Sequence, residues 1–262
     1  MDDLKKLPIV EVFTSIQGEG DFVGTPSVFV RVSGCNLRCC FKDTICDTPY
    51  TSFRPEKKTC GLEDVVKEFE QHPKVEHLVI TGGEPMLYKT GVDLLVDEIK
   101  IRFPERSIYV TMETNGTVEP DPFTRVDFFS ISPKLKTALP VPGKVYRCPD
   151  GSTQVFDADE VHRLDLIRFN PKAIEEMIHL RLFQLKFVYS GPESVQDIDH
   201  CLNTLKDRGV LVIPQDVWIM PEGITNELLT RNAQEAAKVC IDRGWILCDR
   251  LHIHIWGDKR GV

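Results

Sequence analysis

The stretch "PSVFVRVSGCNLRCCFKDTICDTPY", residues 26–50, joins a β-rich run to a short segment that holds four cysteines. The run 26–33 is rich in valine and phenylalanine, which predicts a buried strand. The cysteines that follow it are Cys35, Cys39, Cys40 and Cys46. In sheets built from strand–helix units, ligand-binding loops follow the carboxyl ends of the strands. The stretch therefore predicts a strand that delivers a cysteine-rich loop to a functional site.

β-rich runs alternate with helical patterns along the rest of the chain. The predicted strands are 26–33, 77–81, 107–113, 126–132, 182–190 and 210–220. Apolar residues at helical spacing predict helices over 62–71, 91–103, 193–208 and 225–244, the last with Thr225 as N-cap and Gly244 as its stop. This alternation implies crossover connections and a mainly parallel sheet, either open and doubly wound or part of a barrel. The prolines and glycines of 137–160 predict a surface loop or insertion.

The composition of the 262-residue chain is that of a globular protein with an acidic balance. Its formal net charge of −8 argues against broad binding to nucleic acid or to anionic membranes, because both need a basic surface. No apolar run approaches the ~20 residues of a transmembrane helix, and the charged N-terminal residues do not resemble a signal peptide. We therefore expect a cytoplasmic protein whose nine cysteines are mostly reduced.

Three interpretations compete for the cysteine segment 35–46. A structural zinc site usually has paired C-x2–4-C knuckles, and no second knuckle is clear, although Cys60 could serve as a fourth ligand. A redox pair would have the C-x-x-C spacing, which this segment lacks. An iron–sulfur cluster bound by three thiolates of one loop leaves one iron open to a substrate or cofactor. The spacing favours the cluster and leaves zinc as the alternative.

Glycine-rich or polar motifs follow four of the predicted strands. They are "SGC" (33–35), "TGGEP" (81–85), "ETNGT" (113–117) and "SPK" (132–134). Because the carboxyl ends of parallel strands lie at one edge of a sheet, we expect these loops to converge on a single site.

Taken together, these motifs resemble those of radical S-adenosylmethionine enzymes. "SGCNLRC", a following aromatic residue, "CDT" and "TGGEP" are typical of that superfamily. The motifs "SIQGEG" (15–20), "ISPK" (131–134) and "RLHIHIWGDKRGV" (250–262) make the chain similar to the 7-carboxy-7-deazaguanine synthase family of queuosine biosynthesis. The resemblance implies one radical S-adenosylmethionine domain over 1–262, folded as an incomplete barrel of about six mainly parallel strands with helices outside.

The activity that the resemblance implies is that of a carbon–nitrogen lyase. Such an enzyme converts 6-carboxy-5,6,7,8-tetrahydropterin into 7-carboxy-7-deazaguanine with loss of ammonia. Its cofactors would be a 4Fe–4S cluster, S-adenosylmethionine and Mg2+. A 5′-deoxyadenosyl radical would abstract a substrate hydrogen before the ring contracts. The hard chemistry would belong to the cofactor, while the protein orients the reactants and excludes water.

One departure from the superfamily's C-x3-C-x2-C pattern lies in the cysteine segment. The usual third position is Lys42, whereas "CDT" places the third ligand at Cys46. We interpret "KDTI" (42–45) as a four-residue insertion, which a loop tolerates because added length costs little closure entropy. The implied cluster ligands are Cys35, Cys39 and Cys46, with Cys40 as the alternative to Cys39. A longer family-variable insertion is expected at 137–180.

The resemblance also assigns residues to S-adenosylmethionine and to magnesium. The implied cofactor contacts are Phe41, Asp47, Gly83, Glu113, Ser132, Pro133, Lys134, Met220, Pro221 and Glu222. Gly83 would approach the cofactor closely as part of a glycine-rich turn, and Lys134 would pair with an anionic cofactor group. Thr48, in the "CDT" motif, would give Mg2+ a hard oxygen ligand.

The implied substrate is a flat, polar heterocycle that bears one carboxylate. Amide and carboxylate groups suit the pterin edge, and an arginine fork suits the carboxylate. The implied contacts are Ile16, Gln17, Gly18, Glu19, Arg31, Thr81 and the C-terminal carboxylate of Val262. An arginine within an apolar strand needs an anionic partner, so Arg31 predicts either a bound carboxylate or an acidic side chain elsewhere in the chain.

The resemblance further implies a homodimer and an electron donor such as flavodoxin or ferredoxin. Two alternatives remain. A glycyl-radical activating enzyme shares the cysteine loop and "TGGEP" but would need a protein-binding groove, and a zinc-stabilised binding module would have no catalysis. His252 and His254 alternate along a predicted final strand, so we expect them on one face.

Overall fold

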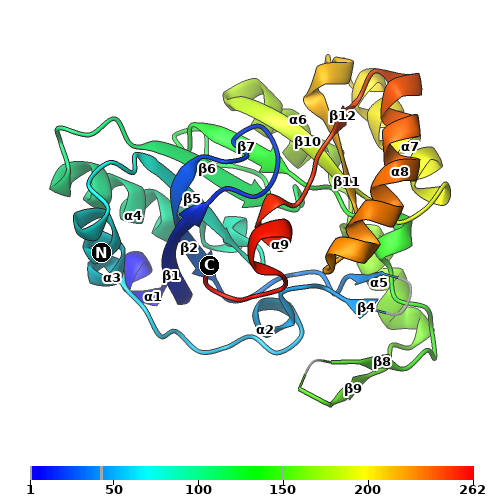
Figure 1. Ribbon diagram of the computed structural model, residues 1–262, viewed down its shortest axis with the longest axis horizontal. Helices are drawn as coiled ribbons and strands as arrows, with labels where there is room; N and C mark the ends of the chain where they lie inside the picture. Colours follow the sequence, from blue (N-terminus) through cyan, green and yellow to red (C-terminus); the bar gives the residue numbers. More distant parts are fainter. Residues whose placement is uncertain (1, 42–43, 149) are drawn as a thin grey trace.

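The computed structural model describes residues 2–41, 44–148 and 150–262. Within them, a sheet of eight strands runs in the order β1-β2-β5-β6-β7-β10-β11-β12 (Figure 1). These strands are β1 (Ile9–Ile16), β2 (Pro26–Val32), β5 (His77–Gly82), β6 (Tyr109–Thr114), β7 (Phe128–Ile131), β10 (Leu182–Tyr189), β11 (Val217–Pro221) and β12 (Ile246–Leu247). β1 is antiparallel to β2, and the pairs from β2 onwards are parallel. β1 and β12 lie at opposite ends of the order, so the barrel that the sheet forms stays open.

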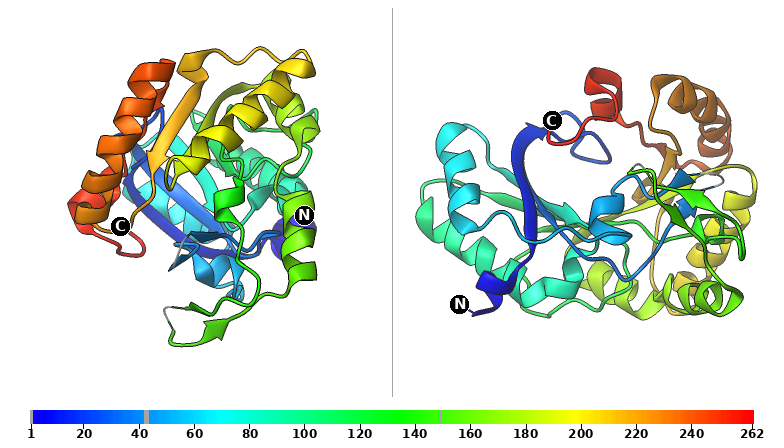
Figure 2. Two further views of the ribbon diagram at one scale, coloured as in Figure 1. Left: turned by 90° about the vertical axis from the view of Figure 1, so that its right-hand side faces the viewer. Right: turned by 90° about the horizontal axis from the view of Figure 1, so that it is seen from below.

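Helices surround this sheet on its outer face (Figures 1 and 2). The α-helices of the described residues are α1 (Asp2–Lys6), α2 (Pro49–Ser52), α3 (Leu62–Gln71), α4 (Lys89–Arg102), α5 (Ala158–Ile167), α6 (Pro171–Leu180), α7 (Glu193–Asp207), α8 (Asn226–Arg243) and α9 (Leu251–Trp256). Short 3-10 helices are η1 (Pro85–Tyr88), η2 (Lys136–Ala138) and η3 (Pro214–Asp216), and two small hairpins are β3 (Cys40–Phe41) with β4 (Thr44–Ile45) and β8 (Tyr146–Arg147) with β9 (Thr153–Gln154). None of the described helices combines the length and the apolar character that a membrane span requires.

Alternation along the strands separates an apolar outer face from a more polar inner face. Val28 and Val30 of β2 belong to the main core under the helices, together with Leu78 and Ile80 of β5. Because neighbouring residues of a strand point to opposite faces, the residues between them line the inside of the barrel. On these two strands the inner residues are Ser27, Phe29, Arg31, His77, Val79 and Thr81. The inner face can therefore carry a polar site at the carboxyl ends of the strands.

The segment after β12 crosses the open side of the barrel from the last strand to the first. The Gly20 N–H donates to Cys248 Sγ over 3.1 Å, and the Leu251 N–H donates to the Gly18 carbonyl over 2.8 Å. Figure 1 shows α9 and the C-terminal residues close to β1. This crossing places residues from the end of the chain against the loop that follows β1.

The predicted fold class is confirmed, because the sheet is mainly parallel, incomplete as a barrel and covered by helices. The helices predicted over 62–71, 91–103, 193–208 and 225–244 correspond to α3, α4, α7 and α8. The Thr225 side chain caps α8, and Gly244 ends it with a φ of 69°. The sequence prediction omits β1 and β12, and it begins β11 too early, since Pro214 starts the helical turn η3.

The final strand predicted for His252 and His254 is wrong. Residues 251–256 form the helix α9, and Gly257 follows it with a φ of 71°. The chain has already left the edge of the sheet at this point, so no neighbouring strand offers the hydrogen bonds that an extended segment would need.

Residues 137–160, predicted as a surface loop or insertion, contain regular structure, and so does the rest of the segment 137–180. α6 packs against β7 and β10 and forms the crossover between these two strands. The preceding part contains η2, the β8–β9 hairpin and α5, and it has a small apolar core in which Tyr146 and Phe156 pack with Cys40 and Ile45. The β8–β9 hairpin projects from the body of the molecule in Figures 1 and 2. That 137–180 varies within a family stays a prediction.

Candidate active site

The cysteine loop begins at the carboxyl end of β2 and divides its four thiols between two environments. Cys35, Cys39 and Cys46 share one apolar cluster. Cys40 packs instead into the small core of the β8–β9 segment. The Cys46 N–H donates to the Cys39 carbonyl over 2.9 Å and holds the two ends of the β3–β4 hairpin together. The structure thus gathers the three cysteines of the predicted ligand set, while residues 42 and 43 of the predicted insertion lie outside the described residues.

Burial keeps these thiols protonated as long as no metal is bound. It raises the pKa of Cys35 to about 11, and it also raises the pKa values of Cys39 and Cys46 above the ordinary range. The Leu37 N–H donates to Cys35 Sγ over 3.4 Å and would favour a thiolate there. Because thiolates are the metal ligands, metal binding at this loop would release protons.

The donor set fits a cluster better than a single ion. Across residues 2–41, 44–148 and 150–262, no group of three His, Cys, Asp or Glu side chains converges closely enough to hold one metal ion. A cubane cluster spreads its thiolates over three irons and needs no such convergence. Cys60, the fourth ligand of the zinc alternative, packs against the main core, and its N–H donates to the Ile9 carbonyl over 3.1 Å.

The "TGGEP" turn packs directly on the start of the cysteine loop. A Cβ at Gly83 would come within 2.1 Å of the Gly34 carbonyl oxygen, so this position requires glycine. Glu84 is fully buried and accepts hydrogen bonds from Thr114 Oγ1 over 2.7 Å and from the Asn115 N–H over 2.6 Å. Burial raises the pKa of Glu84, and these donors oppose that effect. The turn, the cysteine loop and the end of β6 therefore form one rigid unit.

Three of the predicted site residues meet on the inner face of the barrel. Glu113 of β6 accepts one hydrogen bond from Gln17 Nε2 over 3.0 Å and another from Thr81 Oγ1 over 2.9 Å. Gln17 and Thr81 were assigned to substrate and Glu113 to cofactor, and the structure joins them in one group. The Glu19 N–H also donates to Gln17 Oε1, over 3.2 Å, which connects this group to the loop two residues further along the chain.

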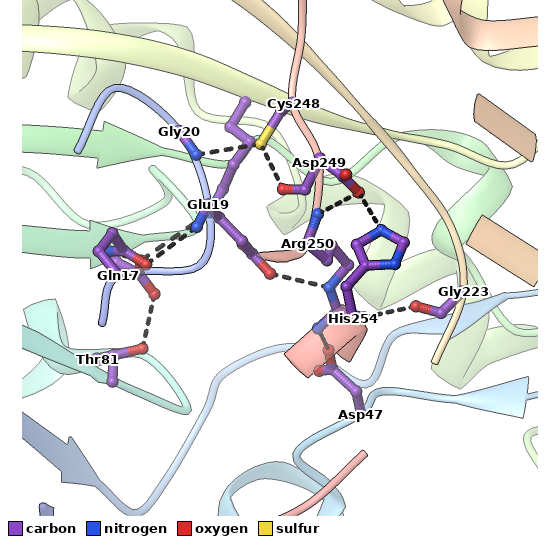
Figure 3. Close-up of polar contacts among 12 residues, drawn as sticks. Gln17, Glu19, Gly20, Asp47, Thr81, Gly223, Cys248, Asp249, Arg250 and His254 are labelled. Carbon is purple, nitrogen blue, oxygen red and sulfur yellow. Dashed lines mark hydrogen bonds and ion pairs between the residues drawn. The ribbon is translucent and has the colours of Figure 1, made fainter. Parts of the chain in front are cut away.

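Glu19 is the centre of a buried ion cluster (Figure 3). Its carboxylate pairs with Lys186 Nζ over 2.6 Å and with Arg250 Nε over 2.9 Å. Burial alone would raise the pKa of Glu19, but the two cations outweigh it and hold that pKa far below its ordinary value. Arg250 also donates to Asp47 Oδ2 over 2.7 Å. The predicted substrate residue Glu19 and the predicted cofactor residue Asp47 are thus joined through one guanidinium.

Sequence reasoning did not select Lys186 or Arg250. Lys186 carries the same signal as Arg31, because it is a cation inside an apolar strand, "LFQLKFVYS" (182–190). Arg250 lies within the motif "RLHIHIWGDKRGV", but nothing in its local pattern marks it as buried. Its partners come from segments about 200 residues away in the chain, and only the fold brings them together.

Arg31 has an acidic partner within the chain. Its Nε donates to Glu11 Oε2 over 2.7 Å across the antiparallel β1–β2 pair. Tyr50 donates its hydroxyl to the same oxygen over 3.1 Å, and Arg260 also pairs with Glu11. Of the two partners that the sequence predicted for Arg31, the acidic side chain is the one that this structure contains.

The remaining predicted cofactor residues lie around the same strand ends. Lys134 Nζ donates to Ser132 Oγ over 2.7 Å, with Pro133 between the two residues. Thr48 Oγ1 lies 3.4 Å from Cys46 Sγ. Phe41 packs against the apolar cluster of the three gathered cysteines, and Met220, Pro221 and Glu222 form the end of β11 and the residue after it. Thr44 of the β3–β4 hairpin donates to Glu222 Oε1 over 3.4 Å, which links the two regions.

The loop after β1 and the C-terminal segment lie against each other. Ile16 ends β1, and a Cβ at Gly18 would come within 2.0 Å of His252 Nδ1, so any side chain at position 18 would displace the His252 ring. Val262 is half-buried. The tail that carries it is held by Arg260, which pairs with Glu56 over 2.7 Å and lies 3.8 Å from the Tyr50 ring centre.

Comparison with known proteins agrees with this site. The chain matches the Radical SAM superfamily over residues 29–132, which include the cysteine loop, the "TGGEP" turn and Glu113. It is 35% identical to the 7-carboxy-7-deazaguanine synthase of Halobacterium salinarum, over 96% of this chain and 91% of that protein. The chain belongs to the 7-carboxy-7-deazaguanine synthase family. A second relative from that family, in Rhodopirellula baltica, is 35% identical over 98% of this chain and 89% of that protein.

A solved structure shares the fold of this 7-carboxy-7-deazaguanine synthase family member. The crystal structure of QueE from Escherichia coli superposes with a TM-score of 0.59 and 23% identity, over 94% of each chain. The predicted superfamily and family are confirmed, and the chain is a radical S-adenosylmethionine enzyme of the lyase type. Membership of the superfamily implies a 4Fe–4S cluster and S-adenosylmethionine. The two alternatives, a glycyl-radical activating enzyme and a zinc-stabilised binding module, are not favoured.

Proposed function

We propose that this protein is a 7-carboxy-7-deazaguanine synthase that acts on 6-carboxy-5,6,7,8-tetrahydropterin and releases ammonia. The observation that carries the proposal is the position of three gathered cysteines beside the polar group of Gln17, Thr81 and Glu113, at the same end of one barrel. A cluster and a flat polar substrate would then lie next to each other. When bound, the cluster and S-adenosylmethionine would supply the 5′-deoxyadenosyl radical that abstracts the substrate hydrogen.

In this proposal Cys35, Cys39 and Cys46 hold the cluster through three irons and leave the fourth iron to the cofactor. Their burial in an apolar cluster would exclude water from that iron. The turn at Gly83 would place peptide groups against the methionine end of S-adenosylmethionine, and its close packing on the Gly34 and Thr51 backbone would hold it there. Ser132 and Lys134 would contact the cofactor from the loop after β7, and Met220, Pro221 and Glu222 would contact it from the end of β11.

The substrate would bind to the polar group on the inner face. Gln17 and Thr81 are held by Glu113 and can present their remaining donor and acceptor positions to the pterin edge. Arg31 uses its Nε for Glu11 and has further N–H groups for the substrate carboxylate. The Val262 carboxylate would complete the pocket, and the Arg260 contacts would hold the tail in position for this role.

Four further features belong to the proposal. Thr48 would provide an oxygen ligand for Mg2+, with the substrate carboxylate and water as its other ligands. The iron–sulfur cluster must receive an electron from an external reductant before it can reduce S-adenosylmethionine. A flavodoxin or a ferredoxin would be a suitable donor. A homodimer and a cytoplasmic location are expected, the latter because the cysteines must stay reduced to bind iron.

The test is turnover under strict exclusion of oxygen. The protein is reconstituted with iron and sulfide, reduced, and supplied with S-adenosylmethionine, Mg2+ and the tetrahydropterin. We expect 7-carboxy-7-deazaguanine and ammonia as products. Because loss of ammonia from this substrate involves no net oxidation, the abstracted hydrogen must be returned, and 5′-deoxyadenosine and methionine should accumulate only from uncoupled cleavage. A fully reconstituted protein that forms no 7-carboxy-7-deazaguanine would contradict the proposed function.

A further inference from the structure

Arg250 occupies an unusual position between two parts of the site. Its Nε donates to Glu19 Oε1 over 2.9 Å, its Nη2 donates to Asp47 Oδ2 over 2.7 Å and its Nη1 donates to the Gly223 carbonyl over 2.8 Å. Figure 3 shows the guanidinium at the meeting point of these three partners. The partners come from the loop after β1, the cysteine loop and the loop after β11. One side chain therefore connects three segments that are separate in the sequence.

The arrangement is costly if its only purpose is stability. The Arg250 side chain is 10% exposed and that of Glu19 is 14% exposed, so both charges have lost most of their water. Desolvation of a buried ion pair can exceed the energy that the pair returns, and apolar replacements are often as stable. A buried pair does, however, fix the relative position of the segments that carry it. This favours a positioning role over a purely structural one.

The two carboxylates that Arg250 contacts, Glu19 and Asp47, differ in how firmly they are held. Glu19 has a second cation, Lys186, at 2.6 Å, and stays held if Arg250 moves. Asp47 is 40% exposed, follows Cys46 directly and has Arg250 as its ion-pair partner. The guanidinium thus transmits position from the firmly held segment around Glu19 to the more exposed end of the cysteine loop.

We propose that Arg250 is a positioning residue that couples substrate binding at residues 17–19 to cofactor binding at residues 46–48. The inference rests on the proposed function. Contacts of the pterin with the first segment would restrain the second further through the guanidinium, so each ligand would bind more tightly in the presence of the other. Such coupling is reciprocal by thermodynamic necessity. It would also restrict cleavage of S-adenosylmethionine to the moment when substrate is present.

The experiment measures S-adenosylmethionine affinity with and without the tetrahydropterin, on anaerobically reconstituted protein. In the wild type we expect the pterin to tighten cofactor binding by about tenfold, within the usual range for coupled sites. Arg250→Lys keeps the charge but cannot hold two carboxylates and a carbonyl at once, so the factor should fall to about one. A second readout is the ratio of 5′-deoxyadenosine to product, which should rise in the variant because cleavage no longer waits for substrate.

A matched control is Arg106→Lys. The Arg106 side chain is 11% exposed and donates to the Phe69 carbonyl over 2.9 Å; it precedes β6, whereas the cysteine loop follows the carboxyl end of β2. This variant should keep the wild-type coupling factor and product ratio. Glu19→Gln removes the carboxylate of the Glu19–Arg250 pair. The double variant with Arg250→Lys should have nearly the same coupling factor as Arg250→Lys alone, because both changes break the same ion pair. If Arg250→Lys does not fold, Glu19→Gln alone gives the measurement.

The outcomes separate the inference from the proposed function. Wild-type protein that makes product, together with an unchanged coupling factor in folded Arg250→Lys, overturns the inference and leaves the function intact. A wild-type factor near one overturns it as well. Wild-type protein that makes no product overturns the function, and the inference fails with it.

Discussion

The two ends of the same barrel strands solve the problem of interior polar groups in opposite ways. At the amino end, the His77 ring is hydrogen-bonded to Ser27 Oγ over 2.7 Å and to Thr111 Oγ1 over 2.8 Å. The ring centres of Phe22 and His77 lie 4.9 Å apart. At the carboxyl end, two of these three strands, β5 and β6, carry Thr81 and Glu113 into a network of ions. The amino-end group is neutral and held by hydrogen bonds between neighbouring strands, and the carboxyl-end group is charged and held by loops distant in the sequence.

This difference distinguishes polar groups that stabilise the fold from polar groups that belong to the candidate site. The amino-end group pairs each hydrogen-bonding atom of the His77 ring, and burial lowers the pKa of His77 to about 4, so the ring stays neutral at physiological pH. The carboxyl-end group keeps its charges although burial opposes them, because Lys186 and Arg250 compensate for it. Buried ion clusters of this kind are enriched at functional sites. Four predictions test this division.

The largest effect is expected at the cysteine loop. Cys35→Ala, Cys39→Ala and Cys46→Ala should each lose the cluster and all detectable product, because two remaining thiolates cannot hold it firmly. Cys40→Ala is the matched control, since Cys40 packs into the neighbouring small core, and it should keep iron, sulfide and activity. Iron and sulfide analysis after anaerobic reconstitution decides the result. A Cys40→Ala protein without cluster, beside a Cys39→Ala protein with one, would reverse the ligand assignment.

The second prediction concerns the rigid turn at the charged end. Gly83→Ala places a Cβ within 2.1 Å of the Gly34 carbonyl oxygen, so the backbone must shift. We expect a loss of about 3 kcal/mol in the free energy of unfolding, as for overpacked positions, and a loss of cluster binding as the cysteine loop moves. Gly61→Ala is the control, because no atom lies within 4 Å of its Cβ position. Urea denaturation of both variants measures the difference, and equal stabilities would show that the turn can yield.

The sequence alone determines much of the strand–helix order but little of the charged network. Valine-rich alternation and helix caps such as Thr225 are local signals, and they predict α8 and the inner strands correctly. β1 is missed because its half-exposed alternation is weak and its partner β2 lies across a turn. Gln17, Thr81 and Glu113 were selected by family motifs, whereas Arg250 was not, since its role depends on contacts across more than 200 residues.

The third prediction separates the two ends by pH. The unfolded chain protonates His77 below a pKa of 6.5, while the folded ring resists protonation until about pH 4, so stability falls as the pH drops through this window. Between pH 7 and pH 5, protonation of His77 in the unfolded chain should lower the free energy of unfolding by roughly 2 kcal/mol. Glu19, whose pKa is also lowered, has linkage of the same sign, but its contribution is lost only below its ordinary pKa of 4.5, outside this window.

The measurement is urea denaturation of cluster-free protein from pH 8 to pH 5. His77→Gln should be less stable than the wild type at pH 7 but should lose less stability on acidification. Between pH 7 and pH 8 the two proteins should run in parallel, because the ring is neutral in both states there. A wild type and variant with the same slope from pH 7 to pH 5 would mean that the His77 ring is accessible to protons in the folded protein.

The smallest effects come from a pair of threonines on neighbouring strands. Thr111→Val removes the hydroxyl that bonds His77 and should cost about 1 kcal/mol in unfolding free energy, with the KM for the pterin unchanged. Thr81→Val removes the hydroxyl that bonds Glu113 and should raise that KM several-fold with little change in stability, because Glu113 keeps its bond to Gln17. Both changes keep the shape of the side chain, so the contrast isolates the hydroxyl. If Thr111→Val raised the KM as much as Thr81→Val, the two ends of the barrel would not be independent, and the neutral group would have to be counted as part of the site.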